Sequence, residues 1–138
     1  MRAVSKISEI INPKTKVVLF NAIEHHFIET IAFSQATLSG MTTQLIPQSK
    51  VLQIKKQKGI ELLNRAKERL DKLPISVETR VIEDEKPEEY ILRVVKEENF
   101  DLVVLGCKGK HSKLKRVVLG TVPTEILNKV SCDVLIVR

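Results

Sequence analysis

Apolar and polar residues follow two different periods along this chain of 138 residues, and the shorter period predicts strands. Residues 16–23 and 102–105 contain uninterrupted apolar runs, which are typical of strands buried on both faces of a sheet. Residues 75–81 instead place an apolar or β-branched residue at every second position, which predicts a strand with one wetter face, as at a sheet edge. The apolar run at 134–137 predicts the final strand.

Apolar residues at helical spacing predict helices between these strands. The first covers residues 1–12, and Asn12 with Pro13 ends it. The second covers residues 50–73, the third begins at Pro87, and the fourth follows Gly120. The residues predicted to face the core are Leu63, Ala66, Leu70, Leu73, Ile91, Val94, Val95, Ile126, Leu127 and Val130.

Residues 24–49 have a weaker pattern, in which 27–38 suit an amphipathic helix and 42–46 suit a loop or a short strand. Alternation of strands and helices of this length predicts an α/β fold. We expect three layers, α/β/α, around a mostly parallel, Rossmann-like sheet of about five strands. Ligands of such sheets bind at the carboxyl ends of the strands, which is where the segment after Leu105 lies.

The segment after Leu105 suits anion binding. Gly106 and Gly109 bracket a tight turn in which the backbone can take a positive φ. Lysines and an arginine crowd residues 108–116, and Thr121 is predicted to cap a helix with Pro123 in its first turn. Glycines, cations and a helix start together predict a phosphate site, whereas the alternative is that the glycines only make turns and the cations only solvate a loop.

Composition narrows the class of protein. With 43% hydrophobic and 29% charged residues, the sequence predicts one soluble globular domain over residues 1–138. Since we find no apolar segment long enough to span a membrane and no signal peptide, we expect a cytoplasmic protein. The net charge of +6 admits an anionic partner, but the absence of Trp and the single Tyr disfavour nucleic acid.

Other candidate chemistry is sparse. Cys107 and Cys132 make neither a disulfide framework nor a metal ligand set, and Cys132 is expected to pack. His25 and His26 suit a solvated loop better than a metal site. Because no general base or acidic metal ligand set is evident, we predict no dedicated enzyme and at most a slow ATPase.

The motif Gly-x2-Gly-x10-Gly-Thr, from Gly106 to Thr121, precedes the terminal run that begins at Cys132, and together they resemble the universal stress protein family. The resemblance extends back through residues 86–106. The ATP-binding members of that family have nine residues between the second and third glycines of the motif, whereas this chain has ten between Gly109 and Gly120. The resemblance implies that ATP, with or without Mg²⁺, or a related adenine nucleotide is the ligand.

The same resemblance assigns roles to individual residues. Gly106, Cys107, Lys108 and Gly109 would wrap the ribose and phosphates through backbone N–H groups. The terminal phosphates would be held by Gly120, Thr121 and Val122. The adenine would be lined by Leu105 and Ala22.

The front half departs from the family, whose first strand usually ends in an Asp that holds the adenosine. In one alignment, residues 14–24 match the second strand and residues 1–11 the first helix, so that the central first strand is missing. In the other, the apolar run at 17–20 is the first strand, 27–38 the first helix and 42–46 the second strand. The first alignment fits without gaps, but a sheet that loses a middle strand needs another segment, such as one from a partner chain, in its place.

Two functions are compatible with these features. One is a regulatory protein that binds an adenine nucleotide. The other is a dimeric interaction module that has lost the nucleotide, since the family's last strand commonly pairs with its counterpart and Val134 to Val137 suit such a homodimer. Glu85, two residues before Pro87, would bring negative charge to the phosphate region if it pointed inward.

Overall fold

A computed structural model describes residues 2–23, 48–106 and 119–137 of the chain. In chain order its elements are α1 (Arg2–Ile10), β1 (Lys16–Ala22), α3 (Gln48–Leu70), β2 (Ser76–Ile82), α4 (Pro87–Glu98), β3 (Leu102–Gly106), α5 (Thr121–Lys129) and β4 (Asp133–Val137). Each corresponds to a helix or strand predicted from the periodicity. The helix predicted at 27–38 and the strand predicted at 42–46 lie outside the described residues.

The strands of the described ranges form two parallel pairs. β1 pairs with β2 in a register that runs from Lys16 opposite Ser76 to Ala22 opposite Ile82. β3 pairs with β4 in the same way, from Leu102 opposite Asp133 to Gly106 opposite Val137. The expected five-stranded sheet is therefore not found among the described residues, which hold four strands in two sheets.

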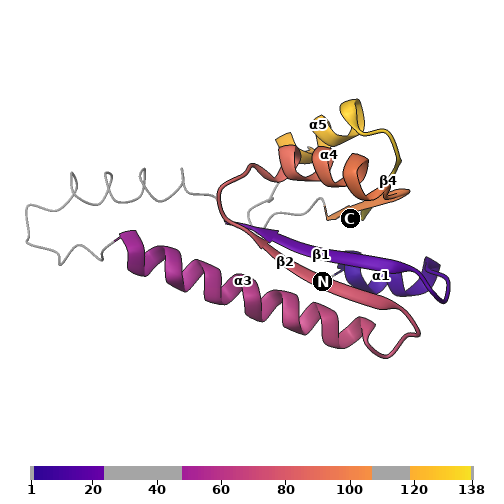
Figure 1. Cartoon of the computed structure of the whole chain (residues 1–138), viewed down its shortest axis with the longest axis horizontal. Coiled ribbons are helices and arrows are strands. Elements are labelled where there is room, and N and C mark those ends of the chain that lie inside the picture. The colour runs from indigo at the N-terminus through magenta and orange to yellow at the C-terminus, as the bar shows by residue number, and fades with distance from the viewer. Residues whose placement is uncertain (1, 24–47, 107–118, 138) are drawn as a thin grey trace, which may run out of the picture.

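Helices cover both faces of the two sheets (Figure 1). On one face, α3 packs on β1 and β2, and α1 contacts α3, β3 and β4. On the other face lie α4 and α5, which contact each other. This is the predicted arrangement of three layers.

The core belongs to both sheets because α4 lies on one face and packs against both of them. Four buried residues of α4 form one cluster with Val103 of β3 and Ile126 of α5, and Phe20 and Ile82 of the β1–β2 sheet pack against it. The buried residues of α4 are Tyr90, Ile91, Val94 and Val95. The other buried apolar residues belong to α3, to β1 and to the residue after β1, and α3 contacts β1; they are Leu63, Ala66, Leu70, Val17 and Ile23. The predicted inward face of α4 is confirmed, and so is that of α3 at Leu63, Ala66 and Leu70, whereas Leu73 lies beyond the end of α3 and is half-buried.

Three burial predictions are wrong. The apolar run of β1 was expected to be buried on both faces of the sheet, but Val17 is the one buried residue of β1, and Val18 to Ala22 are half-buried. The apolar run of β3 was expected to be buried on both faces, but Val103 is its one buried residue and Leu102, Val104 and Leu105 are half-buried. One edge of β3 has no strand beside it within the described ranges, which leaves these side chains partly open. Leu127, expected on the inner face of α5, is 47% exposed, because Ile126 takes the inward position.

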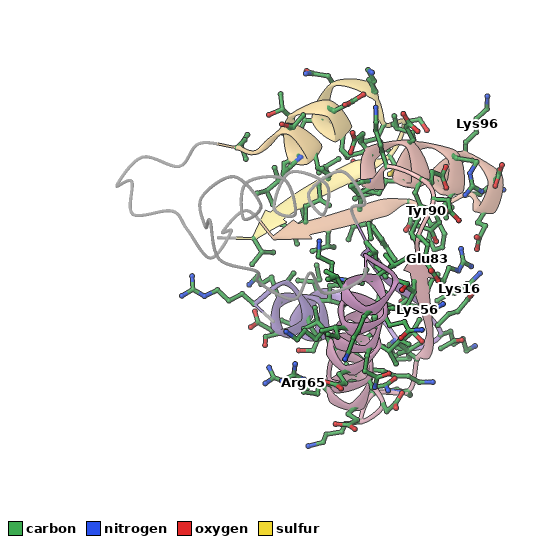
Figure 2. The ribbon with its side chains drawn as sticks, turned by 90° about the vertical axis from the view of Figure 1, so that its left-hand side faces the viewer. Lys16, Lys56, Arg65, Glu83, Tyr90 and Lys96 are labelled. Carbon is green, nitrogen blue, oxygen red and sulfur yellow. The ribbon has the colours of Figure 1, made fainter. Side chains whose placement is uncertain are left out.

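α3 lies close to β1 at one residue, Gly59. A Cβ atom at Gly59 would lie 2.6 Å from Oδ1 of Asn21, so the backbone of α3 approaches β1 more closely there than a larger residue would allow. Lys56, one turn earlier, pairs with Glu83 at 2.6 Å and ties α3 to the segment after β2 (Figure 2). None of the described helices, α3 included, has the length and apolar character to cross a membrane.

Candidate functional site

The predicted site residues that the structure describes lie at the ends of three elements. Leu105 and Gly106 close β3, Ala22 closes β1, and Gly120 to Val122 open α5. Carboxyl ends of parallel strands are where ligands of α/β sheets bind. Cys107, Lys108 and Gly109 lie outside the described residues, as do the lysine cluster and all three histidines.

The start of α5 differs from the prediction by one residue. Gly120 is the N-cap, with φ −66° and ψ 173°, and Thr121 is the first helical residue. The carbonyl oxygen of Gly120 accepts hydrogen bonds from the backbone N–H of Thr124 at 3.2 Å and from its hydroxyl at 3.0 Å. Because Gly120 is the N-cap, the prediction that Thr121 caps this helix is wrong. The helix itself begins where expected.

This helix start leaves backbone donors available. Among the described residues the N–H groups of Thr121 and Val122 have no acceptor, and Pro123 has no N–H. The first turn of α5 contains no acidic residue. Two N–H groups at the positive end of a helix dipole form an arrangement that favours a phosphate or another anion.

Gly106 and Gly120 have free space beside their backbones, and neither has an unusual φ. Neither Gly106 nor Gly120 has a positive φ, so the left-handed backbone that glycine allows is not adopted at Gly106. A Cβ atom at Gly106 would meet no described atom within 4 Å, and one at Gly120 would meet only Cδ of Pro123, at 3.9 Å. Folding of the described residues therefore does not demand glycine at these positions, and the space next to both backbones is open to a ligand.

Glu85 does not act as a free negative charge. Its two carboxylate oxygens accept hydrogen bonds from Arg93 at 3.0 and 2.7 Å. These hydrogen bonds hold the pKa of Glu85 below its usual value. The concern that Glu85 repels phosphate is therefore reduced, because the charge is balanced by an arginine of α4.

An open pocket of about 510 Å³ runs along α5, and of the predicted site it includes Thr121 alone. Its lining residues are Leu119, Thr121, Thr124, Glu125, Asn128 and Lys129. Glu125 and Lys129 are already paired there at 2.6 Å. A paired carboxylate and ammonium do not attract phosphate, so the start of α5 is the better anion site.

Metal and thiol chemistry receive little support from the part of the chain that the structure describes. It contains no group of three or more His, Cys, Asp or Glu side chains placed to hold a metal. Cys132 is partly buried against the core, as predicted, and its thiol contacts the backbone oxygen of Asp133 at 3.6 Å. Burial raises the pKa of this thiol, which makes it less reactive.

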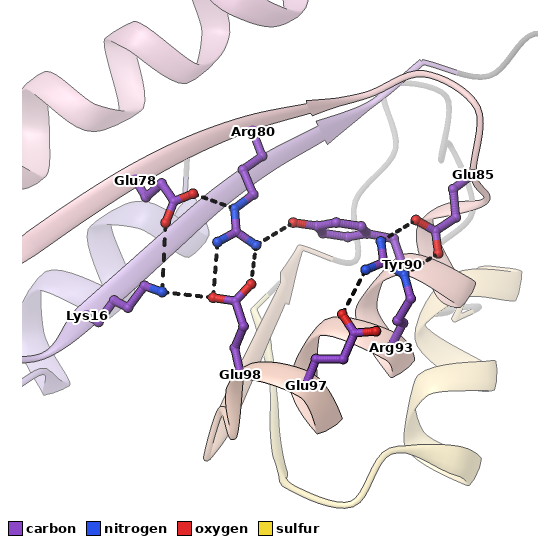
Figure 3. A network of polar contacts seen from close by, with 8 residues as sticks. All are labelled: Lys16, Glu78, Arg80, Glu85, Tyr90, Arg93, Glu97 and Glu98. Carbon is purple, nitrogen blue, oxygen red and sulfur yellow. Dashed lines mark hydrogen bonds and ion pairs between the residues drawn. The ribbon is translucent and has the colours of Figure 1, made fainter.

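A polar network that the sequence analysis missed joins β1, β2 and α4 (Figure 3). Arg80 donates to Glu78 at 2.6 Å, to Glu98 at 2.5 and 3.0 Å, and to the hydroxyl of Tyr90 at 3.2 Å. Lys16 donates to Glu98 at 2.8 Å. The alternation of polar and apolar residues in β2 indicated its polar face. No local pattern, however, indicates that Arg80 bonds to Glu98, which lies 18 positions further along the chain.

This network predicts a dependence of stability on pH. Hydrogen bonds from Arg80 and then Lys16 lower the pKa of Glu98 from 4.5 to about 2. A carboxylate with a depressed folded-state pKa stabilises the fold above its unfolded pKa, and this stabilisation is lost as the pH falls from about 4.5 to about 2. We expect Glu98→Gln to reduce the fall in unfolding free energy across this window, measured by urea titration at each pH.

The matched control is Glu68→Gln, an exposed residue of α3. It should keep the acid dependence of the unchanged chain. Equal acid dependence in Glu98→Gln and the unchanged chain would show that the hydrogen bonds to Glu98 do not stabilise the fold in solution.

The sequence is similar to those of one protein family. A model described as the universal stress protein family matches residues 13–138. The chain is 35% identical over 83 residues to universal stress protein YxiE of Bacillus subtilis (strain 168), a stretch that covers 60% of this chain and 55% of YxiE. It is 27% identical over 88 residues to universal stress protein MJ0531 of Methanocaldococcus jannaschii, covering 64% of this chain and 51% of MJ0531. The matched stretches thus span about half the length of these curated relatives.

Solved structures share the fold. Hypothetical protein MJ0577 aligns with a TM-score of 0.75 and 19% identity, over 98% of this chain and 84% of that one. Hypothetical protein PH0823 aligns with a TM-score of 0.66 and 22% identity, over 99% of this chain and 86% of that one. Identities this low support the fold and nothing finer.

Proposed function

Because the chain belongs to the universal stress protein family, we propose that it is a regulatory protein that binds ATP or a related adenine nucleotide at the carboxyl ends of β1 and β3. Binding would favour one arrangement of the loop after β3 over another and so act as a switch. A dedicated enzymatic activity is not part of the proposal.

The start of α5 is the observation that supports this proposal. Thr121 and Val122 offer two N–H groups without acceptors among the described residues, beside the open backbone of Gly120. We place the terminal phosphates there, with Gly106, Cys107, Lys108 and Gly109 around the ribose and the remaining phosphates. Leu105 and Ala22 would line the adenine.

Mg²⁺ would enter with the nucleotide rather than bind by itself. The described ends of β1, β3 and α5 offer backbone N–H groups and the hydroxyl of Thr121, and no carboxylate. Backbone donors suit phosphate oxygens, whereas Mg²⁺ prefers oxygen ligands, which phosphates and water supply. The ion would therefore be held by the phosphates.

We expect Gly120→Val to weaken ATP binding roughly tenfold or more, which corresponds to about 1.4 kcal/mol or more. The two γ-methyl groups would occupy the space in which the phosphates approach Thr121 and Val122. Titration calorimetry with ATP and Mg²⁺ measures the change. Gly120→Ala should cause a smaller loss, since its Cβ would be in ordinary contact with Pro123 at 3.9 Å.

Ser131→Ala, in the exposed turn after α5, is the control and should bind ATP as the unchanged chain does. Far-UV circular dichroism checks that each variant is folded. No heat at millimolar ATP from the folded, unchanged chain would refute nucleotide binding. Equal affinity of all variants would instead place the nucleotide elsewhere.

A homodimeric interaction module is the second candidate, and the position of β4 favours it. β4 pairs with β3 on one edge, and the other edge has no strand beside it within the described ranges. An open strand of apolar residues, Val134 to Val137, suits pairing with the same strand of a second copy. Dimers in sedimentation equilibrium together with no ATP binding would favour this candidate.

A further inference from the structure

One exposed side of α3 carries cations that have no acidic partner among the described residues, and we propose that it docks a helix of a partner protein. The residues that form this side, which we call the basic seam, are Ile54, Lys58, Leu62, Arg65 and Arg69. The proposal is independent of nucleotide binding, because it assigns an interaction surface on α3 and the chemistry of the partner that fits it. It rests on the exposure, the charge and the spacing of these five residues.

The basic seam runs along α3 on the side opposite Lys56. Lys56 pairs with Glu83, in the segment after β2, at 2.6 Å. Arg65 follows Lys56 by nine residues, which is about two and a half helical turns, so its side chain points away from Glu83 (Figure 2). Since each residue turns a helix by about 100°, the five residues of the seam fall within an arc of about 80°. They therefore form one continuous row on the surface of α3.

All five residues of the seam are exposed to solvent. The two apolar ones, Ile54 and Leu62, are 44% and 40% exposed, although the buried face of the same helix includes Leu63, Ala66 and Leu70. α1 contacts α3, but it leaves these side chains open to solvent. Isolated exposed apolar residues are common on protein surfaces, so what distinguishes these two is their place among cations in one row.

The positive charge of the seam is not balanced within the described ranges. No ion pair joins Lys58, Arg65 or Arg69 to a carboxylate there. Arg65 donates a hydrogen bond to the backbone oxygen of Glu61 at 3.4 Å, which leaves its charge uncompensated. Arg93 of α4, by contrast, pairs with two carboxylates, at 2.7 and 2.9 Å. Because no acidic residue of α3 falls within the arc of the seam, the row attracts a partner of negative charge.

The spacing of the seam suits a second helix. Its residues follow one another at intervals of three or four positions, and from Ile54 to Arg69 the row is about 23 Å long at 1.5 Å per residue. The side chains on one side of a partner helix repeat at the same intervals. Packed helices lie about 8 to 10 Å apart, a distance at which the long side chains of Lys and Arg reach a carboxylate on the partner.

A protein helix fits the seam better than a nucleic acid or a membrane does. Phosphates would meet the carboxylates of Glu61 and Glu68, which border the arc, and would gain nothing from the apolar residues. A membrane-binding helix has a broad apolar face, often with aromatic residues, whereas the seam has two apolar residues and no aromatic one. The partner is accordingly an amphipathic helix with apolar residues opposite Ile54 and Leu62 and with Glu or Asp opposite the cations.

The test uses a synthetic peptide of about 18 residues, long enough to span the seam as a helix. The peptide carries Leu and Glu along one side, at the intervals of the seam, and Ala and Gln elsewhere. We expect saturable binding to the full chain, measured by fluorescence anisotropy of the labelled peptide. Arg65→Glu should weaken this binding roughly tenfold or more, because it places like charges opposite each other. Leu62→Gln should weaken it as well, since it removes apolar contact and keeps the charge.

The matched control is Lys96→Glu on the exposed side of α4, which changes the net charge by the same amount. It should alter the affinity by less than about twofold, because it lies away from the seam and salt screens its charge. A second peptide, in which every Glu is Lys, should bind Arg65→Glu more tightly than it binds the unchanged chain.

Other results would overturn the proposal. Equal losses in Arg65→Glu and Lys96→Glu would reflect net charge alone, and the absence of saturable binding would refute the docking surface directly. Duplex DNA or phosphatidylserine vesicles that bind through Arg65, when the peptide does not bind, would show that the seam recognises another class of partner. Far-UV circular dichroism checks the folding of each variant, and if Leu62→Gln does not fold, the second peptide with Arg65→Glu still decides between these outcomes.

Discussion

Replacing Tyr90 with alanine is expected to lower the free energy of unfolding by about 3–5 kcal/mol, the range for aromatic residues removed from a core. Tyr90 is 4% exposed and belongs to the cluster that α4 forms with Val103 and Ile126. Its ring also packs against Phe20 of β1 at an interplanar angle of 51° and lies 5.5 Å from the guanidinium of Arg93. The substitution thus opens a cavity where α4 joins the two sheets, and urea titration measures the loss.

Tyr90→Phe separates the ring from the hydroxyl. This variant keeps the packing and loses the hydrogen bond from Arg80 at 3.2 Å, which is worth about 1 kcal/mol. Arg80 retains Glu78 and Glu98, so no unpaired cation remains. Equal losses in the two variants would contradict the view that the ring, rather than the hydroxyl, holds the sheets together.

Ile126→Ala is expected to cost a similar amount, about 4 kcal/mol, which is the upper part of the range for buried aliphatic residues. Ile126 is 0% exposed and is the one fully buried residue of α5 among those described. Its loss leaves a cavity between α5, α4 and Val103 that the short helix cannot fill. A fall in the urea midpoint at an unchanged slope would report this loss.

The neighbouring residue provides a matched control. Leu127→Ala removes an exposed side chain of the same size from the same helix, and at 47% exposure it should change stability by no more than about 0.5 kcal/mol. Comparable losses at the two positions would mean that α5 packs through a different face from the one described.

Local pattern predicted the elements well, because each depends on residues close in sequence. The apolar spacing at Ile91, Val94 and Val95 identified the buried face of α4, and the run at 102–105 identified β3. Leu127 was misplaced because a nine-residue helix gives too few turns to tell one apolar position from the next. The N-cap was missed because Thr usually caps by its hydroxyl, whereas Gly120 precedes it here with an extended backbone.

The features that depend on distant residues were harder to predict. Nothing near Arg80 in the sequence indicates that Glu98 and Tyr90 surround it. Glu85 was judged by its place before Pro87, but Arg93, eight residues later, balances its charge. The division of the described strands into two pairs was not predicted, since the apolar runs of β1 and β3 do not specify their neighbours.

The two strand pairs also differ in how far apart along the chain their partners lie. Paired residues are 60 positions apart in β1–β2 and 31 apart in β3–β4. Closing the longer loop costs about 0.6 kcal/mol more in chain entropy, since each doubling of length adds roughly that amount. Contacts closer in sequence also form faster. We therefore expect the carboxyl-terminal unit of β3, α5 and β4 to form first during folding. The pair of β1 and β2 then docks on this unit through α4.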